Sequence, residues 1–150
     1  MAWIRKMQQN KKAWEELERI HYELWTLPGS ISERVSGLII KVLYKLPKRI
    51  RDRVLENVFF ISIGGEGRYE NFSATVTIEH LIILNIPLRY SDKTTESIIA
   101  HEIAHYYLGH TTSGGYAKEK AADRLVQKWG FQRSYTKREL LKLKAKQRRP

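Results

Sequence analysis

The sequence predicts an α+β fold, in which N-terminal helices precede a small, mostly antiparallel sheet and a second group of helices follows it. Residues 3–26 and 31–46 carry apolar side chains at helical spacing. Residues 58–63, VFFISI, are of the β-branched and aromatic types that strands favour. Helical spacing returns from residue 94. Helices, strands and helices in separate blocks indicate α+β rather than an alternating α/β fold.

The composition restricts the class of protein. A chain of 150 residues is long enough for one core, so we expect one domain with three parts: helices over 1–56, the sheet and two helices over 57–131, and a basic helix over 132–150. Cysteine is absent, which excludes disulfides and thiolate metal sites. The N-terminus lacks the apolar core of a signal peptide, and no apolar run reaches the roughly 20 residues of a membrane span. We therefore expect a soluble, cytoplasmic protein.

Turn and capping residues mark the element boundaries of the N-terminal half. The tripeptide LPG at 27–29 ends the first predicted helix. Ser30 and Glu33 form a capping box that predicts the start of the second helix. Pro47 ends that helix, and a short helix is predicted between it and Asn57.

The second half is predicted to contain more strand and then three helices. Residues 73–86, SATVTIEHLIILNI, indicate either one long strand or a hairpin that breaks near Glu79 and His80. The three helices are predicted over 94–108 with Gly109 as cap, over 116–129 with Gly130 as stop, and from a capping box at Thr136 and Glu139 onward.

Basic residues dominate the charge of the chain. The net charge is +11, and the excess gathers in residues 133–150 and in KVLYKLPKRIRDR, residues 41–53. Such runs suit nucleic acid or another polyanion, so the basic C-terminal helix is a candidate binding element for one. A solvated basic face without a ligand is the alternative, because aromatic residues do not interleave with the charges.

The stretch AHEIAHYYLGH, residues 100–110, carries the clearest chemical pattern. His101 and His105 are four residues apart, so a helix places both rings on one face, where they can bind one metal ion. Glu102 points beside that ion and can take a proton from a zinc-bound water, whose pKa zinc lowers to about 7. This HExxH pattern is that of zinc peptidases. The alternative, two buried histidines satisfied by backbone carbonyls, fits the preceding strand and the apolar flanks less well.

The next predicted helix supplies the remaining groups that such a site needs. Glu119 and Asp123 are four residues apart in EKAAD and so share one helical face. Glu119 can complete a His, His, Glu ligand set, and Asp123 can accept the second ring N–H of a zinc-binding histidine.

With His101, Glu102, His105, Glu119 and Asp123, the chain resembles the gluzincins, HExxH metallopeptidases whose third ligand is a glutamate on a following helix. Its ExxAD motif, EKAAD, looks most like that of the heat-shock and CAAX-prenyl membrane peptidases, and LIILNIPLR…SIIAHEIAHYYLGH also looks like the small soluble gluzincins. The similarity covers roughly residues 75–131. It implies a zincin-like active-site helix, one zinc per chain, and a protein or peptide substrate that pairs with a strand within 74–85.

Two questions stay open in the sequence. The group that stabilises the oxyanion is one of His110, Tyr106, Tyr107 and Tyr116. His110 also lies near the place where other HExxH families have a histidine ligand, so the alternative is a DNA-associated or non-catalytic regulator of zincin fold with His110 as third ligand. His21 and His80 are interpreted as structural, with His80 also a candidate for the wall of the cleft.

Overall fold

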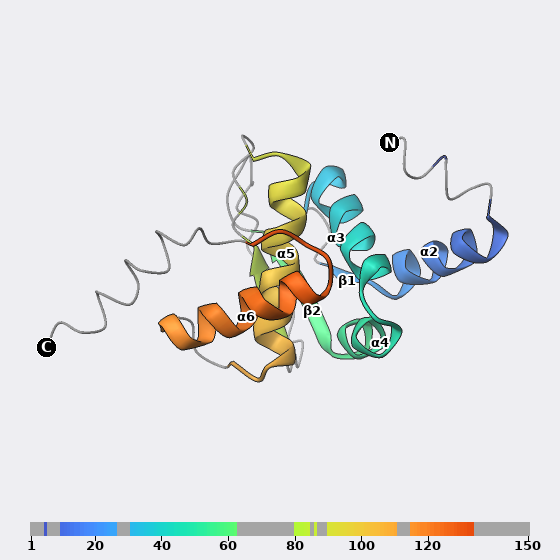
Figure 1. The fold of residues 1–150 in the computed structure, drawn as a ribbon. Helices are drawn as coiled ribbons and strands as arrows, with labels where there is room; N and C mark the ends of the chain where they lie inside the picture. The colour runs from blue at the N-terminus through green and yellow to red at the C-terminus, as the bar shows by residue number, and fades with distance from the viewer. Residues whose placement is uncertain are drawn as a thin grey trace, which may run out of the picture.

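The structure, a computed structural model, describes residues 10–26, 31–62, 80–84, 90–110 and 115–133, together with Arg5 and Ile86 (Figure 1). Within these ranges the chain forms five helices and a small sheet. The predicted basic C-terminal helix and its capping box at Thr136 and Glu139 lie outside the described residues, as does any hairpin near Glu79.

The N-terminal part contains three helices, α2 (Lys11–Glu23), α3 (Glu33–Lys45) and α4 (Lys48–Asn57). The short helix after Pro47 is confirmed. The capping box was wrong: the cap of α3 is Ser32, whose hydroxyl accepts from the backbone N–H of Val35 at 3.3 Å. The first helix also ends earlier than predicted, at Glu23, because the next residues belong to the sheet.

The sheet has the strand order β1-β2-β3 and is parallel, so the predicted antiparallel arrangement was wrong. Its strands are β1 (Trp25–Thr26), β2 (Val58–Ser62) and β3 (His80–Leu84). The helices α3 and α4 lie between β1 and β2 in the sequence, and a helical crossover brings the chain back in the same direction. Because the sequence pattern had assigned Trp25 and Thr26 to a helix, it gave no sign of this crossover.

The last two described helices are α5 (Asp92–Tyr107) and α6 (Tyr116–Lys128), close to the predicted bounds. Gly109 and Gly130 follow them with φ of 70° and 85°, the left-handed conformation expected of a residue that ends a helix. α5 lies at the centre of the molecule, where it contacts α3, α6 and β3 (Figure 1).

One cluster of buried apolar side chains joins the described helices to β2 and β3. Its fully enclosed members include residues of every layer: Ile20, Ile39, Leu43, Val54, Phe60, Leu84, Ile99, Ile103 and Val126. α5 contributes Ile99, Ala100, Ile103 and Ala104, all at 0% exposure. The helix that carries His101 and His105 is therefore held by the core along one whole side.

A buried ion pair adds a polar anchor for α5. The carboxylate of Glu96 is 7% exposed and binds the ammonium groups of Lys41 and Lys45 of α3, the latter at 2.7 Å. Burial alone would raise the pKa of Glu96, but the two ammonium groups hold the pKa below its usual value. Glu96 is thus ionised at neutral pH and ties α5 to α3.

Replacing Glu96 with glutamine is expected to lower the free energy of unfolding by about 1–2 kcal/mol, because two ammonium groups lose their shared carboxylate. Urea denaturation followed by circular dichroism measures the change. Glu15→Gln is the matched control, because Glu15 and Lys11 lie 3.8 Å apart with 60% and 92% exposed side chains, and its effect should stay below about 0.5 kcal/mol. Equal effects of the two substitutions would show that Glu96 does not anchor α5.

Candidate metal centre

His101 and His105 face one another on the surface of α5 that meets α6. Their Nε2 atoms are 3.0 Å apart, and the two rings stand almost at right angles, at 82°. The spacing of four residues places the rings one turn apart, as the sequence predicts. His101 is buried and His105 is partly buried, and both Nε2 atoms face α6.

Glu119 brings a carboxylate to the same point from the first turn of α6. Its Oε2 lies 2.9 Å from Nε2 of His101 and its Oε1 lies 3.4 Å from Nε2 of His105. One ligand atom from each of the three residues lies within 4.8 Å of the other two, so that the group could hold a metal ion. His110 does not belong to this group of described residues.

Asp123 lies one turn after Glu119 and reaches the other side of the His101 ring. Its Oδ1 is 3.0 Å from Nδ1 of His101, and both side chains are 3% exposed. With Asp123 as acceptor, Nδ1 of His101 carries a proton and Nε2 is the nitrogen available to a ligand. This is the position that the EKAAD spacing predicts for Asp123.

The charges of the group are coupled in the metal-free protein. Burial lowers the pKa of His101, but its hydrogen bonds with Asp123 and Glu119 outweigh this and raise the pKa to about 9. Burial likewise raises the pKa of Glu119, and its hydrogen bonds with His101 and His105 bring the pKa down to about 2. At neutral pH a protonated His101 therefore lies between two carboxylates, and a bound cation would replace its Nε2 proton.

Metal affinity should accordingly rise with pH. Below about pH 9 the metal must displace one proton from His101, so zinc affinity is expected to increase by about tenfold per pH unit and to level off above that value. Glu119 is ionised throughout this range and adds no slope. Competition with a chelator of known affinity at several pH values measures the effect. Asp123→Asn removes a charge that raises the pKa of His101 and should flatten the curve; an unchanged curve would contradict this assignment.

Glu102 is next to His101 in sequence but is not in the ligand group. Its carboxyl is partly buried, and burial raises its pKa, with the positive charges of His101 and His105 acting in the opposite direction. A carboxylate with a raised pKa near two histidines is a better proton acceptor at neutral pH than an exposed one. Glu102 is thus a candidate for the general base and not for a metal ligand.

The four candidates for the oxyanion have different surroundings. Tyr106 donates its hydroxyl to the carbonyl of Arg53 at 3.4 Å and packs its ring 4.9 Å from that of His80, which is exposed. Tyr107 packs edge-on against Trp129, with ring centroids 6.2 Å apart. Tyr116 begins α6, where the ammonium of Lys120 lies 5.4 Å from the centre of its ring. Tyr106 and Tyr107 thus have packing roles, and which group meets an oxyanion stays a prediction.

His110 contacts Nδ1 of His105, which is the nitrogen of the His105 ring that does not face the ligand group. The Nδ1 atoms of the two rings are 2.8 Å apart, and the ring centroids are separated by 5.1 Å. From the sequence His110 was expected to be a ligand or an oxyanion group, and this contact was not predicted. Gly109 was the sign of it in the sequence, because a glycine directly after the helix cap folds the next residue, here His110, back over the last turn.

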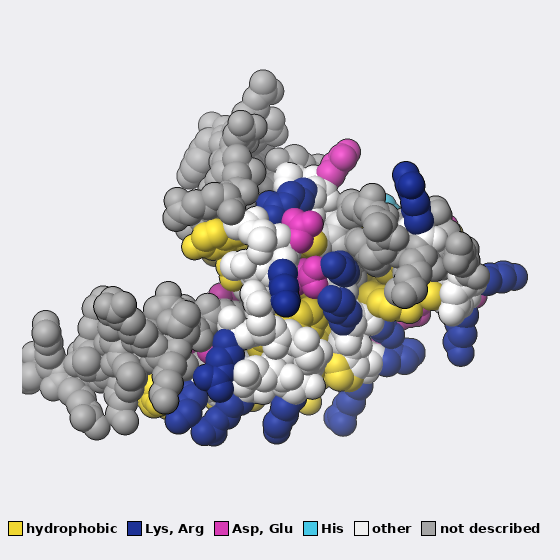
Figure 2. All heavy atoms as spheres, turned by 45° about the horizontal axis from the view of Figure 1, so that its top comes forward, with side chains coloured by type: hydrophobic (Ala, Val, Ile, Leu, Met, Phe, Trp, Pro, Cys, Tyr) yellow, Lys and Arg dark blue, Asp and Glu magenta, His cyan; other side chains and the backbone are white. Residues whose placement is uncertain are grey.

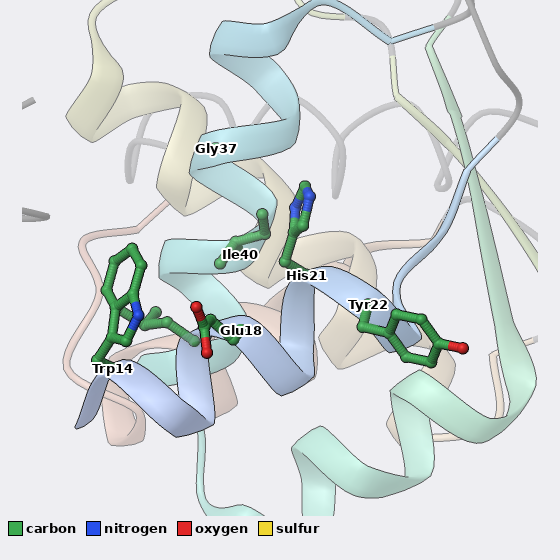
Figure 3. Close-up of a pocket in the computed structure, with 7 residues that line it drawn as sticks. Trp14, Glu18, His21, Tyr22, Gly37 and Ile40 are labelled. Atoms are coloured by element: carbon green, nitrogen blue, oxygen red, sulfur yellow. The ribbon is translucent and has the colours of Figure 1, made fainter. Parts of the chain in front are cut away.

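A hollow lies elsewhere in the described part of the chain, between α2 and α3. It measures about 520 Å³ and is lined by Trp14, Leu17, Glu18, His21, Tyr22, Gly37 and Ile40 (Figure 3). Its walls are mainly apolar, and α5 and α6 contribute none of these lining residues. The hollow is therefore separate from the metal group, and His21 belongs to its wall.

The basic surface is partly accounted for by ion pairs. Lys and Arg side chains line much of the lower rim of the molecule in Figure 2. Within residues 41–53, however, Lys41 and Lys45 bind Glu96, Lys48 binds Asp52, and Arg51 lies 2.9 Å from Glu16. The pairs of Lys41, Lys45 and Arg51 join different helices, and that of Lys48 lies within α4. All four reduce the charge that this cluster offers to a polyanion. The other predicted basic cluster lies almost wholly outside the described residues.

Comparisons of the chain with protein-family models, with curated proteins and with solved structures found no match. Among the described residues, no helix combines the length and the apolar character that crossing a membrane requires.

Proposed function

We propose that the protein is a zinc-dependent endopeptidase, with His101, His105 and Glu119 as zinc ligands and Glu102 as general base. The observation that carries the proposal is the convergence of two Nε2 atoms and one carboxylate from two helices. Glu102 follows His101 on the same helix and lies outside this group. A purely structural site would have no use for Glu102.

Zinc suits this donor set better than other common metal ions. Two imidazole nitrogens and one carboxylate oxygen form the His₂Glu set of catalytic zinc sites, and three protein ligands leave a fourth position open. Calcium and magnesium prefer sites made of oxygen atoms. The two imidazoles therefore favour zinc, and the absence of cysteine removes the thiolate sites that structural zinc prefers.

The side chains around the site divide the work of hydrolysis. When bound, zinc supplies a Lewis acid that lowers the pKa of water and polarises the substrate carbonyl. The carboxylate of Glu102 accepts a proton from the attacking water and passes it to the nitrogen of the departing amine. Asp123 holds the Nδ1 proton of His101, so Nε2 is the nitrogen of that ring that faces the ligand position and gives up its proton to a metal.

The strand β3 fits the role of a substrate-binding edge. It is an outer strand of the described sheet, and it contacts α5, which carries Glu102. Buried Ile82 and Leu84 alternate with Leu81 and Ile83, which are 45% and 49% exposed. In this proposal an extended peptide adds to the outer edge of β3 by backbone hydrogen bonds, with its side chains beside these two residues.

The protein should contain about one zinc per chain. Elemental analysis of protein expressed in zinc-replete medium measures the content, and incubation with an unstructured protein such as casein, with and without a chelator, measures hydrolysis. Zinc-dependent cleavage is the expected result. Purified protein that contains and binds no zinc would overturn the proposal; zinc without cleavage of any tested peptide would overturn the peptidase activity alone.

A further inference from the structure

The C-terminal end of α5 places a third imidazole against a proposed zinc ligand. Tyr107 is the last residue of the helix, Leu108 is its cap, and Gly109 follows with φ of 70°. The backbone N–H of Gly109 donates to the carbonyl of Tyr106 at 3.1 Å, and that of His110 donates to the carbonyl of His105 at 3.0 Å. These two hydrogen bonds define a Schellman motif, which satisfies carbonyls that the end of a helix leaves unpaired.

In a Schellman motif the second residue beyond the cap commonly contacts the residue three positions before the cap. The contact is usually hydrophobic. Here the two residues are His110 and His105, and the contact is a hydrogen bond between Nδ1 atoms at 2.8 Å. The backbone bond from His110 to the carbonyl of His105 holds the same two residues together a second time. The position of the His110 ring is thus set by the way in which the helix ends.

The roles of donor and acceptor follow from the ligand geometry. Nε2 of His105 faces His101 and Glu119, so this is the nitrogen whose lone pair a metal would take. A neutral imidazole then carries its proton on Nδ1. That proton points at Nδ1 of His110, which must accept it and keep its own proton on Nε2. Only one arrangement of the protons on the two rings is therefore compatible with a metal ion at Nε2 of His105.

We propose that His110 is a positioning residue for the metal site: its Nδ1 accepts the Nδ1–H of His105 and fixes the ring and the tautomer in which Nε2 binds the metal. The inference rests on the proposed function, in that His105 is a zinc ligand. It gives His105 a counterpart to the carboxylate that Asp123 provides for His101. It also differs from both roles that the sequence suggested for His110, because here His110 touches neither metal nor substrate.

Loss of the neutral acceptor His110 should weaken zinc binding less than loss of the charged acceptor Asp123. Hydrogen bonds to an ionised carboxylate are roughly twice as strong as those between neutral groups. Partners of metal-binding histidines typically contribute about 10–100-fold in metal affinity. Loss of His110 is therefore expected to weaken zinc binding by about tenfold, at the lower end of that range.

The test compares two substitutions in the full-length chain. His110→Leu keeps an apolar side chain of similar size but has no acceptor, whereas His110→Asn keeps an acceptor oxygen near the position of Nδ1. Zinc affinity is measured by competition with a chelator, and the absorption spectrum of the cobalt-substituted protein reports the ligand geometry. We expect about tenfold weaker zinc binding and a changed cobalt spectrum for His110→Leu, with both properties largely restored in His110→Asn.

Three other outcomes contradict the inference about His110, and a fourth contradicts only the proposed activity. Wild-type affinity in His110→Leu would show that the contact is packing only. Loss as complete as that in His105→Ala, without rescue by asparagine, would make His110 a ligand. A wild-type protein that binds no zinc would overturn both this inference and the proposed function. Normal zinc binding without peptide hydrolysis would overturn the proposed activity while the inference about His110 stands.

Discussion

Replacing Glu102 with glutamine is expected to abolish peptide hydrolysis and to leave zinc content unchanged. The substitution preserves size and removes the carboxylate that takes the proton from water, a contribution of about 10²–10⁴-fold for general bases. Because Glu102 is not in the group formed by His101, His105 and Glu119, the ligands stay intact. The protein should also fold normally, since burial already disfavours the charge of Glu102 and glutamine carries none.

Three measurements on the same preparation separate chemistry from structure. The initial rate of peptide cleavage should fall, while the zinc content and the midpoint of thermal unfolding should match the wild type. Glu56→Gln is a suitable control, because Glu56 is an exposed glutamate on α4 and lies outside the site. Glu102→Gln with the wild-type rate would assign the proton transfer to another residue. Loss of zinc in this variant would instead make Glu102 a ligand.

The elements that local chemistry determines were predicted well. Pro47 cannot continue a helix, and Gly109 and Gly130 adopt the left-handed conformation that ends one, so the limits of α3, α5 and α6 could be located in the sequence. The cap of α3 was misplaced by two residues because Ser30 and Ser32 are both good caps, and only the tertiary path of the chain selects one.

The direction of the strands could not be predicted from the same kind of pattern. Trp25 and Thr26 continue the apolar spacing of the helix before them, yet they pair with Phe59 and Phe60 of β2. That pairing is a contact between residues far apart in sequence, and local propensity does not record it. Without β1 the helices α3 and α4 were not recognised as a crossover, and nothing else in the sequence indicated a parallel sheet.

The site itself was predictable to the extent that helical spacing determines it. The four-residue spacing places His101 and His105 on one face of a helix, whatever the rest of the fold. It does the same for Glu119 and Asp123 on the next helix. That the two faces meet depends on how α5 and α6 pack, which the sequence could only suggest. The contact between His110 and His105 is again local, since it needs only Gly109 and the motif that a glycine produces at the end of a helix.

The last expected result concerns the third zinc ligand, which distinguishes a His, His, Glu site from a site with three histidines. Glu119→Ala should lose most of the zinc affinity, well over the roughly 10–100-fold effect of a residue that only supports a ligand. Its carboxylate is within 2.9 Å of Nε2 of His101, at the point where the ligand atoms converge. Chelator competition measures zinc affinity for this variant beside Asp123→Ala and His110→Ala.

The order of the losses of zinc affinity in the three variants identifies the third ligand. Asp123→Ala should fall within the supporting range, because it leaves the Nδ1 proton of His101 without its charged acceptor. His110→Ala should cost less, because the acceptor that it removes is neutral. The reverse order, with zinc lost in His110→Ala and kept in Glu119→Ala, would falsify the His, His, Glu ligand set. It would favour a histidine-ligated site, and binding of DNA by the basic chain would then become the function to test, through its dependence on salt.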